Sequence, residues 1–168
     1  MNRHGKGYGE GEIIKYALSH SRYLADSNAF IKCTGKLWVT NYEKCLSEWN
    51  GIFTANAHFS NVFNLRSTKI EYIDTRFYLV DKKFFLDNLL DAHFDYGFEK
   101  KISIETNFLT KVTSLNLKKY IFSIQPVIEG VGGGSGTYYK NNLKRRLKYK
   151  LKKFILKNSK RFQDLIYS

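Results

Sequence analysis

Cysteine is scarce in this chain of 168 residues, which contains only Cys33 and Cys45. Two cysteines form no disulfide framework, and this pair lacks the spacing of metal ligands, so we expect reduced thiols in a cytoplasmic protein. Long apolar runs are also missing, since none approaches the roughly 20 residues that a membrane-spanning helix requires. Residues 1–10 lack the apolar segment of a signal peptide. At this length we expect one domain whose core needs no disulfide or metal.

Acidic residues are scarce at the C-terminal end. Residues 140–168 contain eleven lysines or arginines and a single acid, Asp164, which gives this segment a net charge of +10. Residues 1–139, which we call the body, account for only +3 of the total of +13. The isoelectric point of 9.7 is therefore a property of the tail and says little about the body.

Apolar residues in the tail recur at helical spacing, which predicts a basic amphipathic helix over Lys140–Tyr167. Such a helix is typical of segments that lie on an anionic membrane surface. Packing on the body is the second interpretation and nucleic-acid binding the third, because an apolar stripe serves the first two and not the third. The residues assigned to the membrane contact are Lys144, Arg145, Arg146, Leu147, Leu151 and Phe154.

The body is predicted to be α/β. Its apolar, aromatic and β-branched segments predict three strands of one sheet, at Phe30–Val39, Ile70–Val80 and Tyr120–Val127. Ile52–Phe63 alternates imperfectly and is interpreted as a strand followed by a loop. Helical spacing and capping residues such as Asn41 and Asp81 predict helices at Glu12–Leu24, Tyr42–Trp49, Lys82–His93 and Ile102–Leu115.

Charged residues interrupt two of the predicted strands. The first ends in Lys32-Cys-Thr-Gly-Lys36, which indicates a site for an anionic ligand because open α/β sheets bind ligands at strand ends. A core strand whose lysines extend into water is the plainer alternative. The second carries Asp74-Thr-Arg76, which form either part of a site or a structural ion pair.

Two segments are rich in glycine. Gly5–Gly11 precedes the first predicted helix, where Lys6 and the backbone N–H groups of Gly7 and Gly9 are suited to a phosphate. It lacks the full dinucleotide-binding fingerprint, and a flexible loop is the alternative. Glu129–Gly136 is predicted to be a mobile loop that brings backbone amides to a ligand, or else a plain linker to the tail. It lacks the lysine of a P-loop.

Taken in order, these segments resemble the bacterial GT-A-type glycosyltransferases that build lipopolysaccharide and capsule. Position 36 is lysine where the family tends to have arginine, which removes a bidentate fork but keeps the charge. The family also has an upstream nucleotide-binding βαβ portion, and this sequence contains no Asp-x-Asp metal motif, so the chain resembles the C-terminal portion of such an enzyme. The matching segments, which cover most of residues 5–140, are Lys6–Leu18, Asp26–Lys36, Asp74–Tyr78, Lys83–Leu90, Ile104-Glu105 and Pro126–Gly136.

The resemblance implies a partial GT-A-like mixed sheet with flanking helices over residues 1–139, followed by the basic helix of residues 140–168. It implies transfer of a sugar from a nucleotide-sugar donor to a bacterial surface glycan, with Glu105 and Asp74 as catalytic carboxylates. The residues expected to bind substrate are Lys32, Gly35, Lys36, Arg76, Gly132, Gly133, Gly134, Ser135 and Gly136, and those expected to bind phosphate are Lys6, Gly7 and Gly9.

No cofactor is assigned, although a divalent Mg or Mn ion is expected if an upstream portion supplies its ligands. The expected partners are the nucleotide-sugar donor, the glycan acceptor and the anionic inner-membrane surface, which together imply a cytoplasmic protein peripheral to that membrane. The alternative function is a non-catalytic basic module that binds membrane or nucleic acid through its C-terminal helix. Binding of a nucleotide sugar distinguishes the two functions.

Overall fold

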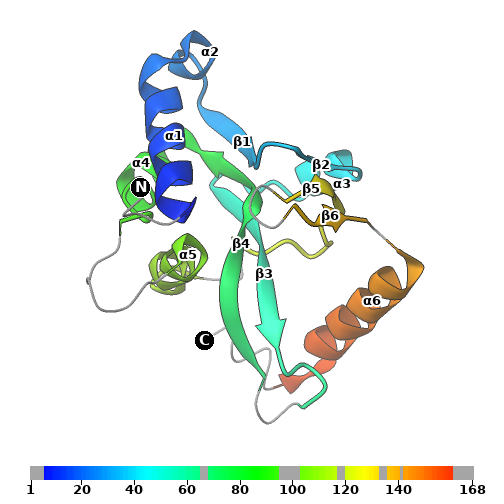
Figure 1. Ribbon diagram of the computed structural model, residues 1–168. Helices are drawn as coiled ribbons and strands as arrows, with labels where there is room; N and C mark the ends of the chain where they lie inside the picture. Colours follow the sequence, from blue (N-terminus) through cyan, green and yellow to red (C-terminus); the bar gives the residue numbers. More distant parts are fainter. Residues whose placement is uncertain are drawn as a thin grey trace.

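The computed structural model describes residues 6–64, 68–94, 103–116, 120–132, 136–140 and 142–160. Within this part of the chain the fold is mixed α and β, with six helices and two three-stranded antiparallel sheets (Figure 1). The prediction of a fold built from both helices and strands is therefore confirmed, whereas the single mixed sheet is wrong, because the described strands pair only in an antiparallel manner and form two sheets. None of the helices in the described residues is both long and apolar enough to cross a membrane.

The elements follow one another in an order that mixes helices and strands. They are α1 (Lys6–His20), α2 (Arg22–Ala25), β1 (Ala29–Cys33), β2 (Leu37–Val39), α3 (Tyr42–Leu46), β3 (Phe53–Ser60), β4 (Lys69–Asp81), α4 (Lys82–Asn88), α5 (Ile104–Thr113), β5 (Ile128–Val131), β6 (Tyr138–Tyr139) and α6 (Leu143–Asn158).

The larger sheet, sheet A, has the order β1-β4-β3, so the long strand β4 lies at its centre. The register between β4 and β3 shifts twice, by one residue after the pair His58–Tyr72 and by more between the pairs Ala55–Tyr78 and Asn56–Asp74. The residues between Asp74 and Tyr78 therefore have no partner on β3 and form a bulge. Bulges bend a strand and redirect its side chains, and they are common beside functional sites.

The smaller sheet, sheet B, has the order β2-β5-β6. The predicted strand Phe30–Val39 is extended but serves both sheets, because the chain turns at Thr34–Lys36 and places β1 in sheet A and β2 in sheet B. Lys36 adopts the left-handed conformation, with φ of 66°, that this turn requires. Glycine adopts this conformation at lower cost, yet the residue with the positive φ is Lys36 and not the neighbouring Gly35.

The predicted strand Tyr120–Val127 is wrong, because the strand in this region is β5 and starts at Ile128. Before it, the chain touches the edge of sheet A at a single bridge between Ile121 and Ala55. Side chains satisfy much of its backbone instead. The Asn41 side chain donates from Nδ2 to Gln125 O at 2.9 Å and accepts at Oδ1 from Val127 N at 2.7 Å. The Glu48 carboxylate accepts from the backbone N–H groups of residues 123 and 124. These bonds replace a strand ladder.

The main hydrophobic core includes Ile104, Phe108 and Val112 of α5, which pack on one face of sheet A, and it extends to Leu156 of α6. A smaller cluster on the other face contains Phe77, Leu79, Cys45 and Phe122. Figure 1 shows α1, α4 and α5 on one side of sheet A and α6 on the other. The two faces of β4 therefore serve different surroundings, which decides where its charged residues lie.

The loop predicted for Gly5–Gly11 is wrong over the described residues, because α1 already begins at Lys6. A Cβ on Gly7 would lie 3.0 Å from Ile104 Cγ2, and one on Gly11 would lie 2.0 Å from His93 Cγ. These glycines lie one helical turn apart and let α1 approach α5 and His93 closely. Their packing role offsets the roughly 0.5–1 kcal/mol that glycine costs inside a helix.

Helix α4 starts after its predicted cap, Asp81, whereas the predicted cap of α3, Asn41, makes no capping hydrogen bond because its side chain bonds Gln125 O and Val127 N instead. The Asp81 carboxylate accepts from Phe84 N, the Ser103 hydroxyl from Thr106 N and the Asn142 side chain from Arg145 N. The helix predicted over Lys140–Tyr167 is confirmed for α6, whereas residues 161–168 lie outside the described residues. The helix predicted over Glu12–Leu24 is interrupted at Ser21 and continues as α2.

We expect Gly11→Ala to lower the free energy of unfolding by about 1–3 kcal/mol, because the new methyl group would lie 2.3 Å from His93 Cβ, which a rotamer change cannot move away. Gly9→Ala is the matched control, since a Cβ there meets nothing within 4 Å. It should stabilise the protein by up to about 1 kcal/mol through helix propensity. Urea denaturation of both variants measures the difference, and equal stabilities would contradict the packing of α1 against His93.

Candidate anion-binding site

The bulge in β4 presents an ion pair between Asp74 and Arg76. Asp74 Oδ1 accepts from Arg76 Nε at 2.8 Å and from Arg76 N at 3.1 Å, while Asp74 Oδ2 accepts from Arg76 Nη2 at 2.6 Å. Asp74 is only 4% exposed. The hydrogen bond to Asp74 raises the pKa of Arg76 above its ordinary value. The guanidinium is therefore charged at every physiological pH and held in one orientation.

The Tyr139 ring lies against the same guanidinium, with its centroid 5.2 Å from Arg76 Cζ. Gly132 in turn allows that ring to approach, because a Cβ on Gly132 would lie 2.9 Å from Tyr139 Cε2. A cation over an aromatic face is attracted to it. Gly132, Tyr139 and Arg76 therefore form one packed row between the glycine-rich segment and β4.

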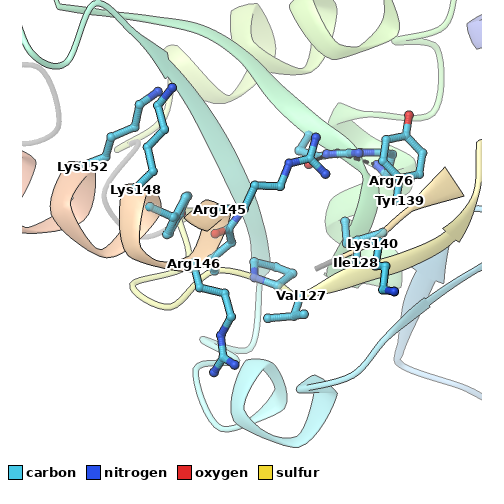
Figure 2. Close-up of a pocket in the computed structure, with 13 residues that line it drawn as sticks. Arg76, Val127, Ile128, Tyr139, Lys140, Arg145, Arg146, Lys148 and Lys152 are labelled. Atoms are coloured by element: carbon cyan, nitrogen blue, oxygen red, sulfur yellow. Dashed lines mark hydrogen bonds and ion pairs between the residues drawn. The ribbon is translucent and has the colours of Figure 1, made fainter. Parts of the chain in front are cut away.

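This row borders a cavity of about 270 Å³ between β4, the segment before β5, β6 and α6 (Figure 2). Six of its lining residues are lysine or arginine, and Asp74 is the single acid among them. In Figure 2, Lys148 and Lys152 extend side by side from α6 and Arg145 extends in the direction of Arg76, whereas Arg146 points away. The lining residues are Asp74, Arg76, Gln125, Pro126, Val127, Ile128, Tyr139, Lys140, Arg145, Arg146, Lys148, Tyr149 and Lys152. We call this cavity the cationic pocket.

Most of the positive charge in the cationic pocket is not neutralised by protein. Asp74 is committed to Arg76, and among the described residues no carboxylate forms an ion pair with Lys140 or with the four cations that α6 contributes. Like charges gathered in one concave surface raise the local positive potential and concentrate anions there. The pocket is therefore suited to a multiply charged anion such as a phosphate or diphosphate.

Three residues of α6 hold the helix against the body. Tyr149 Oη donates to Asn56 Oδ1 at 3.0 Å, Lys153 Nζ donates to Phe122 O, and Leu156 joins the core at 5% exposure. Burial raises the pKa of Tyr149 and lowers that of Lys153 to about 8, although the charge of Glu48 opposes the second shift. Asn56 faces Asp74 in the β3–β4 register, so α6 docks directly beside the bulge.

Lys32 lies outside the cationic pocket and is 8% exposed. Its ammonium donates to Glu10, to Thr34 Oγ1 at 2.8 Å and to Thr75 O, which occupies all three of its donors. Burial lowers the pKa of Lys32 to about 8, and the charge of Asp74 opposes that shift most strongly. The contacts favour a structural role, because they tie α1, β1 and β4 together.

Gly35 and Lys36 also lie outside the cationic pocket, in the exposed turn between β1 and β2. The backbone of this turn contacts the start of the glycine-rich segment, since Lys36 O accepts from Val131 N at 3.0 Å. A Cβ on Gly130, whose φ is +120°, would lie 2.1 Å from Lys36 O, so that position requires glycine. Gly136 has a φ of +64°. Gly133, Gly134 and Ser135 lie outside the described residues, as does the side chain of Lys6.

Glu105 is half-buried in the first turn of α5, whose apolar residues pack in the main core with Ile73 and Tyr78. Asp74 lies opposite Asn56 in the β3–β4 register, and the Asn56 side chain accepts a hydrogen bond from Tyr149 of α6, on the other side of sheet A. The structure therefore does not bring Glu105, Lys32 and Lys36 into the pocket that contains Asp74 and Arg76. Gly7 and Gly9 belong to the first turn of α1 and do not line this pocket either.

Sequence reasoning missed Tyr139, Lys140, Lys148 and Lys152 as site residues, and it assigned Arg145 and Arg146 to a membrane. One signal was available. Arg145, Lys148 and Lys152 recur at helical spacing and form a basic row on one face of α6. The partner of that row, the β4 bulge, is remote in sequence, so the pocket itself was not predictable from the tail.

The described residues contain no group of three or more His, Cys, Asp or Glu side chains that is arranged to hold a metal ion. Comparison with protein-family models, with curated proteins and with solved structures gave no match.

Replacing Asp74 by alanine should lower the free energy of unfolding by about 2 kcal/mol. This is less than the roughly 3–5 kcal/mol for breaking a fully buried pair, because the Arg76 side chain is 38% exposed. Asp87→Ala is the control, because Asp87 and its partner Lys83 are both exposed and such pairs contribute little. Chemical denaturation compares the two variants. If Asp74→Ala is as stable as Asp87→Ala, the pair at the bulge does not constrain the fold.

Proposed function

We propose that this chain is a glycosyltransferase, corresponding to the C-terminal portion of a GT-A-like enzyme. It transfers a sugar from a nucleotide-sugar donor to a hydroxyl of a bacterial surface glycan. The observation that carries the proposal is the cationic pocket, whose charge and lining suit the diphosphate of such a donor. The order of the sequence motifs supports the same class of enzyme.

The pocket offers a separate surface to each part of a nucleotide diphosphate. Arg76 presents a planar fork that Asp74 holds in place, and guanidinium forks bind phosphate oxygens in a bidentate manner. Arg145, Lys148 and Lys152 add charge from α6. The Tyr139 ring and the Pro126–Ile128 segment form an apolar wall suited to a ribose or base. At about 270 Å³ the cavity holds part of a donor rather than all of it.

The cations also suit the reaction. When the bond between the anomeric carbon and the diphosphate oxygen breaks, negative charge grows on the departing nucleotide diphosphate. Fixed cations stabilise that charge in the transition state. The acceptor hydroxyl forms the new bond to the anomeric carbon and gives its proton to a carboxylate.

The two candidate carboxylates have different surroundings, which suggests different roles. Asp74 already accepts three hydrogen bonds from Arg76 and is proposed to position that guanidinium. Glu105 makes no hydrogen bond or ion pair with another described residue, so its carboxylate is available to accept a proton. Glu105 lies outside the cationic pocket, however, so the geometry does not place it within hydrogen-bond reach of an acceptor hydroxyl bound beside Arg76.

We expect uridine diphosphate to bind the full chain, as a probe for the nucleotide part of a donor. The triple variant Arg145→Ala, Lys148→Ala, Lys152→Ala should weaken that binding by at least about tenfold, because each of the three substitutions removes a charge-assisted contact to phosphate. The control is Lys144→Ala, Lys150→Ala, Lys157→Ala, which removes the same charge from α6 at positions that do not line the pocket. Isothermal titration calorimetry without membranes measures both affinities.

Equal losses in the two triple variants would mean that α6 attracts nucleotides only through its overall charge. Inorganic pyrophosphate serves as a second probe. If it binds as tightly as uridine, guanosine and adenosine diphosphates, the pocket recognises phosphate alone and the donor class is wrong. Asp74→Asn should weaken nucleotide binding because it loosens the Arg76 guanidinium, whereas Glu105→Gln should keep that binding because Glu105 does not line the pocket.

The alternative function, a non-catalytic basic module, predicts no specific nucleotide binding and no transfer. One observation favours a further surface on the tail whichever function holds. The apolar residues of α6 that the sequence assigned to a membrane are exposed, and they lie away from the cationic pocket.

A further inference from the structure

Helix α6 has two apolar faces, and the body covers only one of them. Leu156 and Tyr149 pack inward, where one joins the core and the other bonds Asn56. A second set of large apolar side chains lies in solvent. Its members and their exposed fractions are Leu143 at 71%, Leu147 at 59%, Leu151 at 52% and Phe154 at 67%. We call these four residues the outer row.

The outer row forms a continuous stripe along the helix. At about 100° per residue, its four side chains fall within a sector of roughly 80°, and Leu156 and Tyr149 point in the opposite direction. Isolated apolar residues on a surface are ordinary, whereas four in one stripe form a contiguous apolar surface. Body packing, one of the interpretations left open by the sequence, therefore explains the inner face of α6 and leaves the outer row unexplained.

The charges that border the outer row identify its partner. Lys144 flanks it on one side and Lys150 and Lys157 on the other, and α6 contains no acidic residue. A second copy of the chain is excluded as the occupant by charge, because pairing two such helices would bring two basic borders together. Nucleic acid would use the lysines but would leave the apolar stripe in water. A surface that is apolar inside and anionic at its boundary satisfies both features.

We propose that α6 docks on an anionic lipid bilayer. The outer row inserts into the boundary between headgroups and acyl chains, and the flanking lysines contact lipid phosphates. A helix of this length lies flat along about 24 Å of the surface. Apolar insertion and attraction to anionic lipid act together in such helices, and neither is strong alone. The proposal is independent of sugar transfer, since the pocket lies on the body-facing side of α6.

The test uses the full chain and sedimentation with two kinds of vesicle, phosphatidylcholine alone and phosphatidylcholine with phosphatidylglycerol. We expect binding to the anionic vesicles only. The variant Leu147→Ser, Leu151→Ser, Phe154→Ser keeps every charge and should lose at least about tenfold in vesicle affinity. Raising the salt from about 0.1 to about 1 M should also weaken binding, because the screening length falls from about 10 to about 3 Å.

The matched control removes three exposed apolar side chains elsewhere, in the variant Ile13→Ser, Tyr23→Ser, Phe63→Ser, whose exposed fractions are 70%, 79% and 57%. It should bind vesicles as the unchanged chain does. The outer-row variant should unfold at the same urea concentration as the unchanged chain, because its residues are exposed.

Three results would overturn the proposal. The first is full vesicle binding by the outer-row variant, and the second is a loss of folding stability in that variant, which would make the stripe part of the core. The third is equal binding of the unchanged chain to neutral and anionic vesicles. Nucleotide titration without vesicles is measured separately, so failure of the membrane contact and failure of the donor site remain distinguishable.

Discussion

The bulge in β4 is the constraint on which the rest of the structure depends. Because the residues after Asp74 have no partner on β3, Arg76 folds back onto Asp74, and Thr75 O accepts from Lys32. Lys32 in turn bonds Glu10 of α1, while Arg76 O accepts from Thr34 N and fixes the turn that separates the two sheets. One irregularity in a central strand thus connects α1, both sheets and the candidate site. In a regular strand these backbone groups would pair with β3, and a buried carboxylate at this position would lack the hydrogen bonds that offset its burial.

The position of α6 follows from the same region. Asn56, opposite Asp74, bonds Tyr149, and Phe122, which bonds the free edge of β3 through Ala55, accepts from Lys153. The inner face of α6 therefore carries its basic residues to Arg76 and leaves the outer row in solvent. Gathering like charges is unfavourable for the folded chain alone. That cost is offset when an anion enters, and for this reason we interpret the pocket as a binding site rather than as incidental surface charge.

Two proposals rest on the two sides of one helix. The pocket supports binding of a nucleotide diphosphate, and the outer row supports docking on an anionic bilayer. Their physical demands differ, since the first requires converging donors in a concave site and the second an apolar stripe with basic borders. Arg145 shows why the distinction matters, because its charge alone fits both partners and only its direction, toward Arg76, assigns it to the pocket.

The sequence by itself determined the elements whose cause is local. The presence of both helices and strands, most of β4 and the start of α4 follow from apolar spacing and from the cap Asp81, whose hydrogen-bond partner lies three residues away. For Asp74 and Arg76, the sequence left open whether they form part of a site or a structural ion pair. Only the tertiary structure decided what depends on distant partners. Gly7 and Gly11 are accommodated inside a helix because the absence of a Cβ lets α5 and His93 pack closely against them. The segment Phe30–Val39 divides into two strands because its halves pair with β4 and β5. The cationic pocket joins residues about 70 positions apart, and periodicity within α6 marks its two faces without telling which one the body covers.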